Sequence, residues 1–189
     1  MRRLVFSPRS IPVAMLTLAL CGPAPVVPDE GPAPARADKP ESPASHGVRL
    51  ADVWADLAAR DLDGRTWTAA DFQGRVVLLD FWATWCAPCL ADFPHLERAR
   101  AGYGDRDLVI LAISLDRSGR DDLRSFRRRQ AVTWPVLFDG VGAAGAVPRR
   151  FQVEYPPRSL LFDRRGRLVA VDARGHTLDA ALRVLFAAD

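Results

Sequence analysis

One segment near the middle of the 189-residue chain constrains the fold more than any other. Residues 76–81 form a largely apolar run of strand-forming residues, and Cys86 and Cys89 follow within eight residues. Two thiols three residues apart at the head of a helix share one helical turn. A helix N-terminus carries about half a positive charge and spare N–H donors, so it stabilises a thiolate relative to a thiol. The segment predicts a strand–helix unit carrying thiols suited to disulfide exchange.

The rest of the folded part alternates apolar strands with helices. We expect strands over 108–113, 136–138, 159–163 and 168–172, and helices over 86–101, 121–131, 143–151 and 178–186. A hairpin turned at Asp63-Gly64 precedes them. Thr177 is expected to cap the last helix, with Asp179 in its first turn. This alternation indicates an α/β fold with a mixed sheet covered on both faces.

The net charge of +3 comes entirely from the N-terminus. Arg2, Arg3 and Arg9 lie in the first 21 residues, which contain no acid, so the remainder carries 23 basic and 23 acidic residues. A body without net charge gives no electrostatic reason to expect nucleic acid or an anionic membrane surface as a partner.

The first 21 residues are typical of an export signal. The apolar core, residues 11–20, is shorter than the roughly 20 residues that span a bilayer. Cys21 closes this core and resembles the lipid-attachment cysteine of bacterial lipoproteins, although Leu20 stands where that pattern has Gly, Ala or Ser. A lipid anchor, cleavage at the small-x-small site 35–37, and an uncleaved membrane anchor all stay open. Each places the domain outside the cytoplasm, in the periplasm or on the outer side of a membrane.

Residues 22–47 have the composition of a linker. Seven prolines alternate there with Ala, Gly and charged residues, without an apolar period. Such a segment cannot bury enough apolar surface to fold. We therefore expect a signal or anchor over 1–21, a disordered linker over 22–47 and one folded domain over 48–189.

Two other uses of a Cys-x-x-Cys pair fit this sequence less well. A zinc site needs two more N or S ligands. The third cysteine lies in the leader, and His46, His95 and His176 show no ligand spacing, so we expect no metal site. A purely structural disulfide is disfavoured by the flanking tryptophans and by the position between strand and helix.

Further motifs surround the cysteine pair. They are Asp-Leu-Asp-Gly at 61–64, Phe-Gln-Gly-Arg at 72–75, Phe-Trp-Ala-Thr-Trp-Cys-Ala-Pro-Cys at 81–89 and Pro-Arg-Ser-Leu-Leu-Phe-Asp-Arg-Arg-Gly at 157–166. With them, the chain from about Leu57 onward resembles the TlpA/ResA-type thiol-disulfide oxidoreductases, which are membrane-anchored or periplasmic members of the thioredoxin superfamily. The resemblance implies a thioredoxin-like α/β fold, whose central mixed sheet is flanked by helices. An N-terminal β-hairpin and a helix–strand insertion are added to that core.

The resemblance assigns roles to residues around the thiols. Cys86 would be the exposed nucleophile and Cys89 the more buried resolving thiol, with no cofactor beyond their redox-active disulfide. Pro88 suits the first helical turn because that position needs no N–H donor. Trp85 is expected to shield the disulfide and contact substrate, whereas Trp82 is expected to pack in the core.

Two carboxylates are candidates for proton transfer. Asp80 lies inside an apolar strand, where a charge is costly unless the pKa rises. Its position matches the buried aspartate of thioredoxin, which relays protons to the resolving thiol; a hydrogen-bonded structural acid is the alternative. Asp92 stands where ResA-like proteins have an active-site glutamate, one methylene longer. It is expected either to serve the thiols or to be a solvated helix residue.

Two consecutive prolines complete the predicted site. Pro157 matches the cis-proline that faces the disulfide in this fold. Pro156 departs from the family, in which the preceding residue presents its backbone to a bound peptide as a neighbouring strand would. Proline lacks the N–H for that contact, so we expect weaker or less general peptide binding.

The leading function is an extracytoplasmic thiol-disulfide oxidoreductase that reduces protein disulfides. The resemblance suggests apocytochrome c as one client, a role in cytochrome c maturation, and a membrane thiol donor of the DsbD/CcdA type as the electron source. An oxidase or isomerase stays open because the Ala87-Pro88 pair does not fix the direction of electron flow. A peroxiredoxin-like peroxidase is disfavoured by Ala83, which occupies the place of that family's threonine. A dithiol metallochaperone for Cu(I) is permitted but has no Met or His ligands nearby in sequence.

Overall fold

A five-stranded mixed sheet with strand order β5-β4-β3-β6-β7 organises the structure. The computed structural model describes residues 49–117 and 119–187, which belong to one compact unit, Lys39–Asp189. Its strands are β1 (Ala59–Arg60), β2 (Thr66–Trp67), β3 (Val76–Trp82), β4 (Leu108–Ser114), β5 (Val136–Leu137), β6 (Arg158–Phe162) and β7 (Leu168–Val171). Its α-helices are α1 (Leu50–Trp54), α2 (Ala87–Tyr103), α3 (Arg120–Arg129), α4 (Ala146–Arg150) and α5 (Gly175–Ala187).

Strand β3 is the centre of the sheet and carries the one ionisable residue of its seven. It pairs with β4 in parallel and with β6 antiparallel. All seven residues are buried, because the strand is covered on both faces. In this register Asp80 lies opposite Ala112 on β4 and Ser159 on β6.

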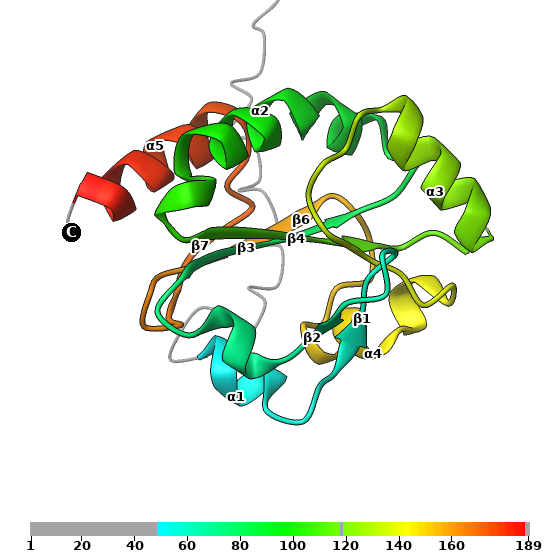
Figure 1. Cartoon of the computed structure of the whole chain (residues 1–189), viewed down its shortest axis with the longest axis horizontal. Coiled ribbons are helices and arrows are strands. Elements are labelled where there is room, and N and C mark those ends of the chain that lie inside the picture. Colours follow the sequence, from blue (N-terminus) through cyan, green and yellow to red (C-terminus); the bar gives the residue numbers. More distant parts are fainter. Residues whose placement is uncertain (1–48, 118, 188–189) are drawn as a thin grey trace, which may run out of the picture. The chain divides into compact units, whose positions relative to one another are not determined.

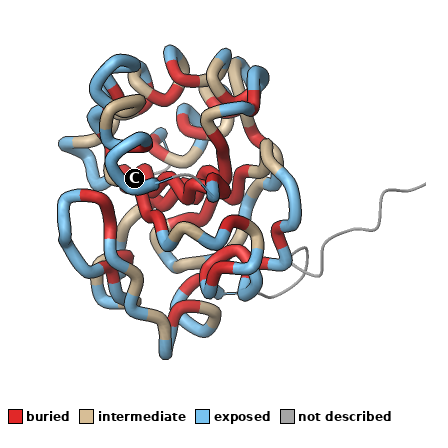
Figure 2. Tube along the Cα trace, turned by 90° about the vertical axis from the view of Figure 1, so that its right-hand side faces the viewer, coloured by how far each residue is buried: buried red, intermediate tan, exposed pale blue. Residues whose placement is uncertain are grey.

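The helices form a layer on each face of the sheet (Figure 1). One face is covered by α2, α3 and α5, and the other by α1, α4 and the β1–β2 hairpin. Successive side chains of a strand point to opposite faces. Leu78 and Trp82 accordingly pack with α2 and α5, whereas Val77, Leu79 and Phe81 pack with α1 and α4. The buried residues concentrate along the strands between the two layers (Figure 2). Asp80 shares the parity of Leu78 and Trp82, so it faces the α2 layer.

The predicted strands, hairpin and order of the long helices are confirmed. Three local features differ from the prediction. The short helix α1 is missing from the prediction; it buries Trp54 against Phe72, with ring centroids 4.9 Å apart. The helix expected over 143–151 is a 3-10 turn followed by α4, interrupted at Gly145.

Thr177 is the third correction. Helix α5 begins at Gly175, so Thr177 lies inside its first turn instead of capping it. Its hydroxyl donates to the carbonyl of Arg174 at 2.7 Å and accepts from the N–H of Arg174 at 2.9 Å. Asp179, expected in the first turn, lies beyond it and contacts His95 of α2.

The predicted signal, the linker and the lipidation candidate Cys21 lie outside the described residues and stay predictions. Within residues 49–117 and 119–187, none of the helices combines the length and apolar character needed to cross a bilayer.

Candidate functional site

Cys86 and Cys89 form a disulfide at the N-terminus of α2, with an S–S distance of 2.03 Å. Cys86 is the N-cap of the helix, and its Sγ accepts a hydrogen bond from the N–H of Cys89 at 3.3 Å. Pro88 occupies the second helical position, where a missing N–H costs nothing. The sequence therefore places the sulfur of Cys86 among the unpaired donors of a helix start, which favour its thiolate once the disulfide is reduced.

The expected exposure of Cys86 is not found in this oxidised state. Both cysteines are only 4% exposed. Its role as the attacking thiol stays a prediction.

The two tryptophans before the cysteines lie in different environments. Trp82 is fully buried and packs edge-on against Phe93 at 5.3 Å, as expected for a core residue. Trp85 is 64% exposed, immediately before Cys86. A large exposed aromatic beside a reactive pair is available for contact with a client, which is the role predicted for it.

Asp116 holds the loop that leads to the cysteines. This buried carboxylate accepts hydrogen bonds from the N–H of Thr84 at 3.1 Å and from the Thr84 hydroxyl at 2.7 Å. It also accepts from the hydroxyl of Ser114, at the end of β4, at 2.8 Å. The sequence analysis missed Asp116, although an acid just after an apolar strand was a usable signal.

Asp80 lies in the core on the α2 face of the sheet. Burial raises the pKa of this carboxyl to about 7, and the charge of Asp92 raises it too, whereas the charge of Arg174 lowers it. A carboxyl with a pKa near 7 exchanges its proton readily at neutral pH. This environment suits the predicted proton relay.

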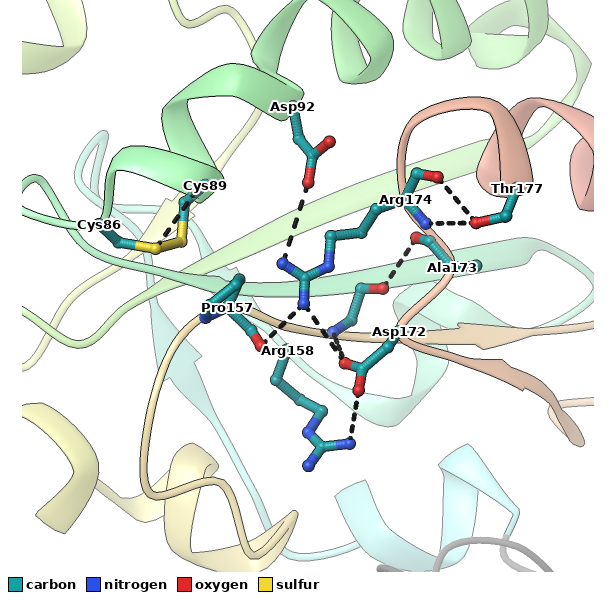
Figure 3. A network of polar contacts seen from close by, with 10 residues as sticks. Cys86, Cys89, Asp92, Pro157, Arg158, Asp172, Ala173, Arg174 and Thr177 are labelled. Carbon is teal, nitrogen blue, oxygen red and sulfur yellow. Dashed lines mark hydrogen bonds and ion pairs between the residues drawn. A yellow bond between two sulfur atoms is a disulfide. The ribbon is translucent and has the colours of Figure 1, made fainter. Parts of the chain in front are cut away.

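Asp92 points toward Arg174, and its Oδ2 lies 3.9 Å from an Nη of that arginine (Figure 3). Arg174 also donates to the carbonyl oxygen of Pro157 at 2.8 Å and lies 3.5 Å from the carboxylate of Asp172. The arginine stands in the turn between β7 and α5, outside the sequence motifs described above. Sequence reasoning missed it because only the folded chain brings it to α2.

The bond between Pro156 and Pro157 is cis, as predicted. The loop enters β6 directly after it, and Tyr155 just before it is 78% exposed. Pro156 offers no backbone donor at this point, so the predicted weakness in binding an extended peptide stays open to test.

Two of the histidines that show no ligand spacing in the sequence, His95 and His176, come together in the fold. His95, His176 and Asp179 each place a ligand atom within 4.8 Å of the others, and they could hold a metal ion. Nδ1 of His95 is already engaged, at 3.1 Å from Asp179 and at 2.7 Å from Arg98. The group also stands at the N-terminal end of α5, where the helix dipole disfavours a cation. As it stands, the cluster connects α2 to α5.

Comparison with known proteins agrees with this geometry. A family model described as "AhpC/TSA family" matches residues 50–171. The chain is 28% identical over 122 residues to the thioredoxin-like protein YneN of Bacillus subtilis (strain 168), covering 64% of this chain and 69% of YneN. It is also 28% identical over 114 residues to the thiol-disulfide oxidoreductase ResA of Bacillus thuringiensis subsp. konkukian (strain 97-27), covering 60% of this chain and 64% of ResA.

Among solved structures, the chain is similar to the thioredoxin domain of a thiol-disulfide oxidoreductase from Bacteroides vulgatus. The TM-score is 0.60 at 25% identity, covering 68% of this chain and 92% of that domain. The fold and the cysteine pair thus define the class, a thiol-disulfide oxidoreductase with a thioredoxin-like fold. The chain belongs to the AhpC/TSA family, and within the thioredoxin superfamily it is of the TlpA/ResA type.

Proposed function

We propose that this protein acts outside the cytoplasm as a reductant of protein disulfides. The observation that carries the proposal is the placement of the Cys86–Cys89 pair at the start of α2, on the face of β3 where Asp80 is buried. Two relatives are named as a thiol-disulfide oxidoreductase and a thioredoxin-like protein, which supports the same chemistry.

The reaction proceeds in two exchanges. The Cys86 thiolate attacks one sulfur of the client disulfide, and the other client sulfur leaves as a thiolate and takes a proton from water. Cys89 then gives its proton to the Asp80 carboxylate, and its sulfur attacks Sγ of Cys86. The mixed disulfide breaks, and the second client thiolate takes up the proton. The client gains two electrons, and a dithiol donor at the membrane must return two to the Cys86–Cys89 disulfide.

Asp80 favours reduction over oxidation of clients. A strong oxidant owes its high potential to a stabilised reduced form. An ionised carboxylate buried on the same face as the dithiol disfavours a neighbouring thiolate, which destabilises the reduced form and favours electron donation.

The reduction potential of the Cys86–Cys89 couple tests this direction. A value near or below that of thioredoxin, about −270 mV, supports a reductant. A value near −120 mV, typical of a strong oxidant, would reverse the assignment to an oxidase.

We propose apocytochrome c as a client and a membrane thiol donor of the DsbD/CcdA type as the source of electrons. A cytochrome c peptide with its two haem-attachment cysteines oxidised should be reduced by the dithiol form of the protein. Failure on that peptide, with turnover on other protein disulfides, would leave a general reductase.

The location rests on the predicted leader. Labelling of the full chain with a fatty-acid analogue, lost in Cys21→Ser, would support a lipid anchor. Recovery of unlabelled, shortened protein from the extracytoplasmic fraction would instead support cleavage.

The AhpC/TSA match keeps one second candidate, a thiol peroxidase. Ala83 occupies the position of the peroxidase threonine, so the donor that would polarise a peroxide is missing there. An assay for peroxide consumption, with a dithiol as reductant, separates the two functions.

A further inference from the structure

The segment 172–174 is bound closely to the loop that carries cis Pro157. Asp172 accepts hydrogen bonds from Arg158 at 3.0 Å and from the N–H of Ser159 at 3.3 Å. Ser159 in turn donates its hydroxyl hydrogen to the carbonyl of Ala173 at 2.9 Å. These contacts fix the turn after β7 to the start of β6, which lies beside Asp80 in the sheet.

Arg174 extends this connection to the helix that bears the cysteines. One Nη donates to the carbonyl of Pro157 at 2.8 Å, and the other lies 3.9 Å from Asp92 on α2 (Figure 3). The side chain is only 22% exposed, so water screens its charge less than that of a surface arginine. A planar guanidinium can contact a carbonyl and a carboxylate at once because its donors point in different directions.

We propose that Arg174 is a positioning residue for the dithiol reaction. Its side chain joins the carbonyl of cis Pro157 to Asp92 on the active-site helix, and it brings a fixed positive charge to the buried face of β3. Only the effect of Arg174 on turnover rests on the proposed function. Its contacts and its effect on Asp80 are expected in both the oxidised and the reduced protein.

The charge has a consequence for proton transfer. The charged groups that act on Asp80 are Asp92 from α2, which raises its pKa, and Arg174 from the turn after β7, which lowers it. The thiols of Cys86 and Cys89 join them in the reduced form. Without Arg174, Asp80 would hold its proton to higher pH, and less of it would be available as the base for Cys89.

The test is an NMR titration of the Asp80 carboxyl carbon in the oxidised full chain, labelled at aspartate. The wild-type midpoint is expected at about 7. Arg174→Gln should raise it by about half a unit or more, and Asp92→Asn should lower it. Arg183→Gln removes an equal charge from an exposed position of α5 and should leave it unchanged. Equal midpoints in Arg174→Gln and Arg183→Gln would overturn the proposal.

A second measurement needs no variant, so it decides the matter even if Arg174→Gln does not fold. In the wild type, the Nε resonance of Arg174 should shift with the same midpoint as Asp80, whereas that of Arg183 should not. An Arg174 resonance that stays constant through the Asp80 midpoint would overturn the proposal.

Turnover gives the kinetic readout. Below its midpoint, the fraction of ionised Asp80 falls tenfold per pH unit, so a half-unit rise lowers the rate on the acid side about threefold. Arg174→Lys keeps the charge and should recover most of that loss. If the wild type reduces no disulfide at any pH, the proposed function fails, while the two NMR measurements still decide the role of Arg174.

Discussion

The two faces of strand β3 differ in the side chains that they bury. On one face Val77, Leu79 and Phe81 belong to an apolar cluster that includes side chains of α1 and α4. On the other face Leu78 and Trp82 enclose a buried acid, Asp80, below the helix that carries the cysteines. Burying a carboxyl costs free energy unless it keeps its proton. The first face therefore serves stability, and the second gives up stability to hold a group that can exchange protons.

The largest expected effect is on the chemistry of the second face. Cys86→Ser should reduce disulfide turnover at least about a thousandfold, to background, because no attacking thiolate remains. Cys89→Ser should still attack, and mass spectrometry should find it trapped in mixed disulfides with client. The control is Cys21→Ser, which should turn over at the wild-type rate. Trapping by Cys86→Ser instead would exchange the roles of the two thiols.

Phe81→Ala tests the first face. This side chain is fully buried and packs against Phe151, so its truncation should lower the free energy of unfolding by about 3–5 kcal/mol. Chemical denaturation of the reduced protein measures the change. Turnover per folded molecule should stay near wild type, because Phe81 points away from α2. If turnover per folded molecule fell together with the free energy of unfolding, the two faces would not have separate roles in stability and chemistry.

Asp80→Asn should increase the stability of the folded protein at high pH, whereas Phe81→Ala decreases it. The folded-state pKa of about 7 lies above the unfolded value of about 3.9, so the folded protein binds the proton more tightly. Stability falls as pH rises between these values, by about 4 kcal/mol in all, and then levels off. The variant lacks this loss, so it should be more stable than wild type at pH 8 and similar near pH 4.

Asp121→Asn is the matched control, since that side chain is 95% exposed and should show no such pH dependence. Turnover of Asp80→Asn should also lose its acid limb near pH 7. If the difference in free energy of unfolding between Asp80→Asn and wild type were the same at pH 8 as at pH 4, burial of the Asp80 charge would cost no stability.

The contrast between the faces also marks what the sequence could predict. Apolar strands, the cysteine pair and Asp80 follow from local pattern, and Pro157 followed from resemblance. The contacts of Arg174 with Asp92, of Asp116 with Thr84 and of His95 with Asp179 each join residues at least 32 positions apart in the sequence, and no local pattern contains that information. The capping role expected for Thr177 failed because α5 begins three residues earlier than predicted, at Gly175.

The smallest expected effect concerns Pro156, where the site meets its client. Pro156→Thr restores a backbone N–H beside cis Pro157, and one added hydrogen bond is worth about 1 kcal/mol. Turnover on protein disulfides should therefore rise up to about fivefold. Turnover on a small aromatic disulfide should not change, because such a substrate has no strand to pair, and it serves as the control. Unchanged or lower turnover on protein disulfides would mean that clients bind through side chains such as Trp85, without pairing to the loop.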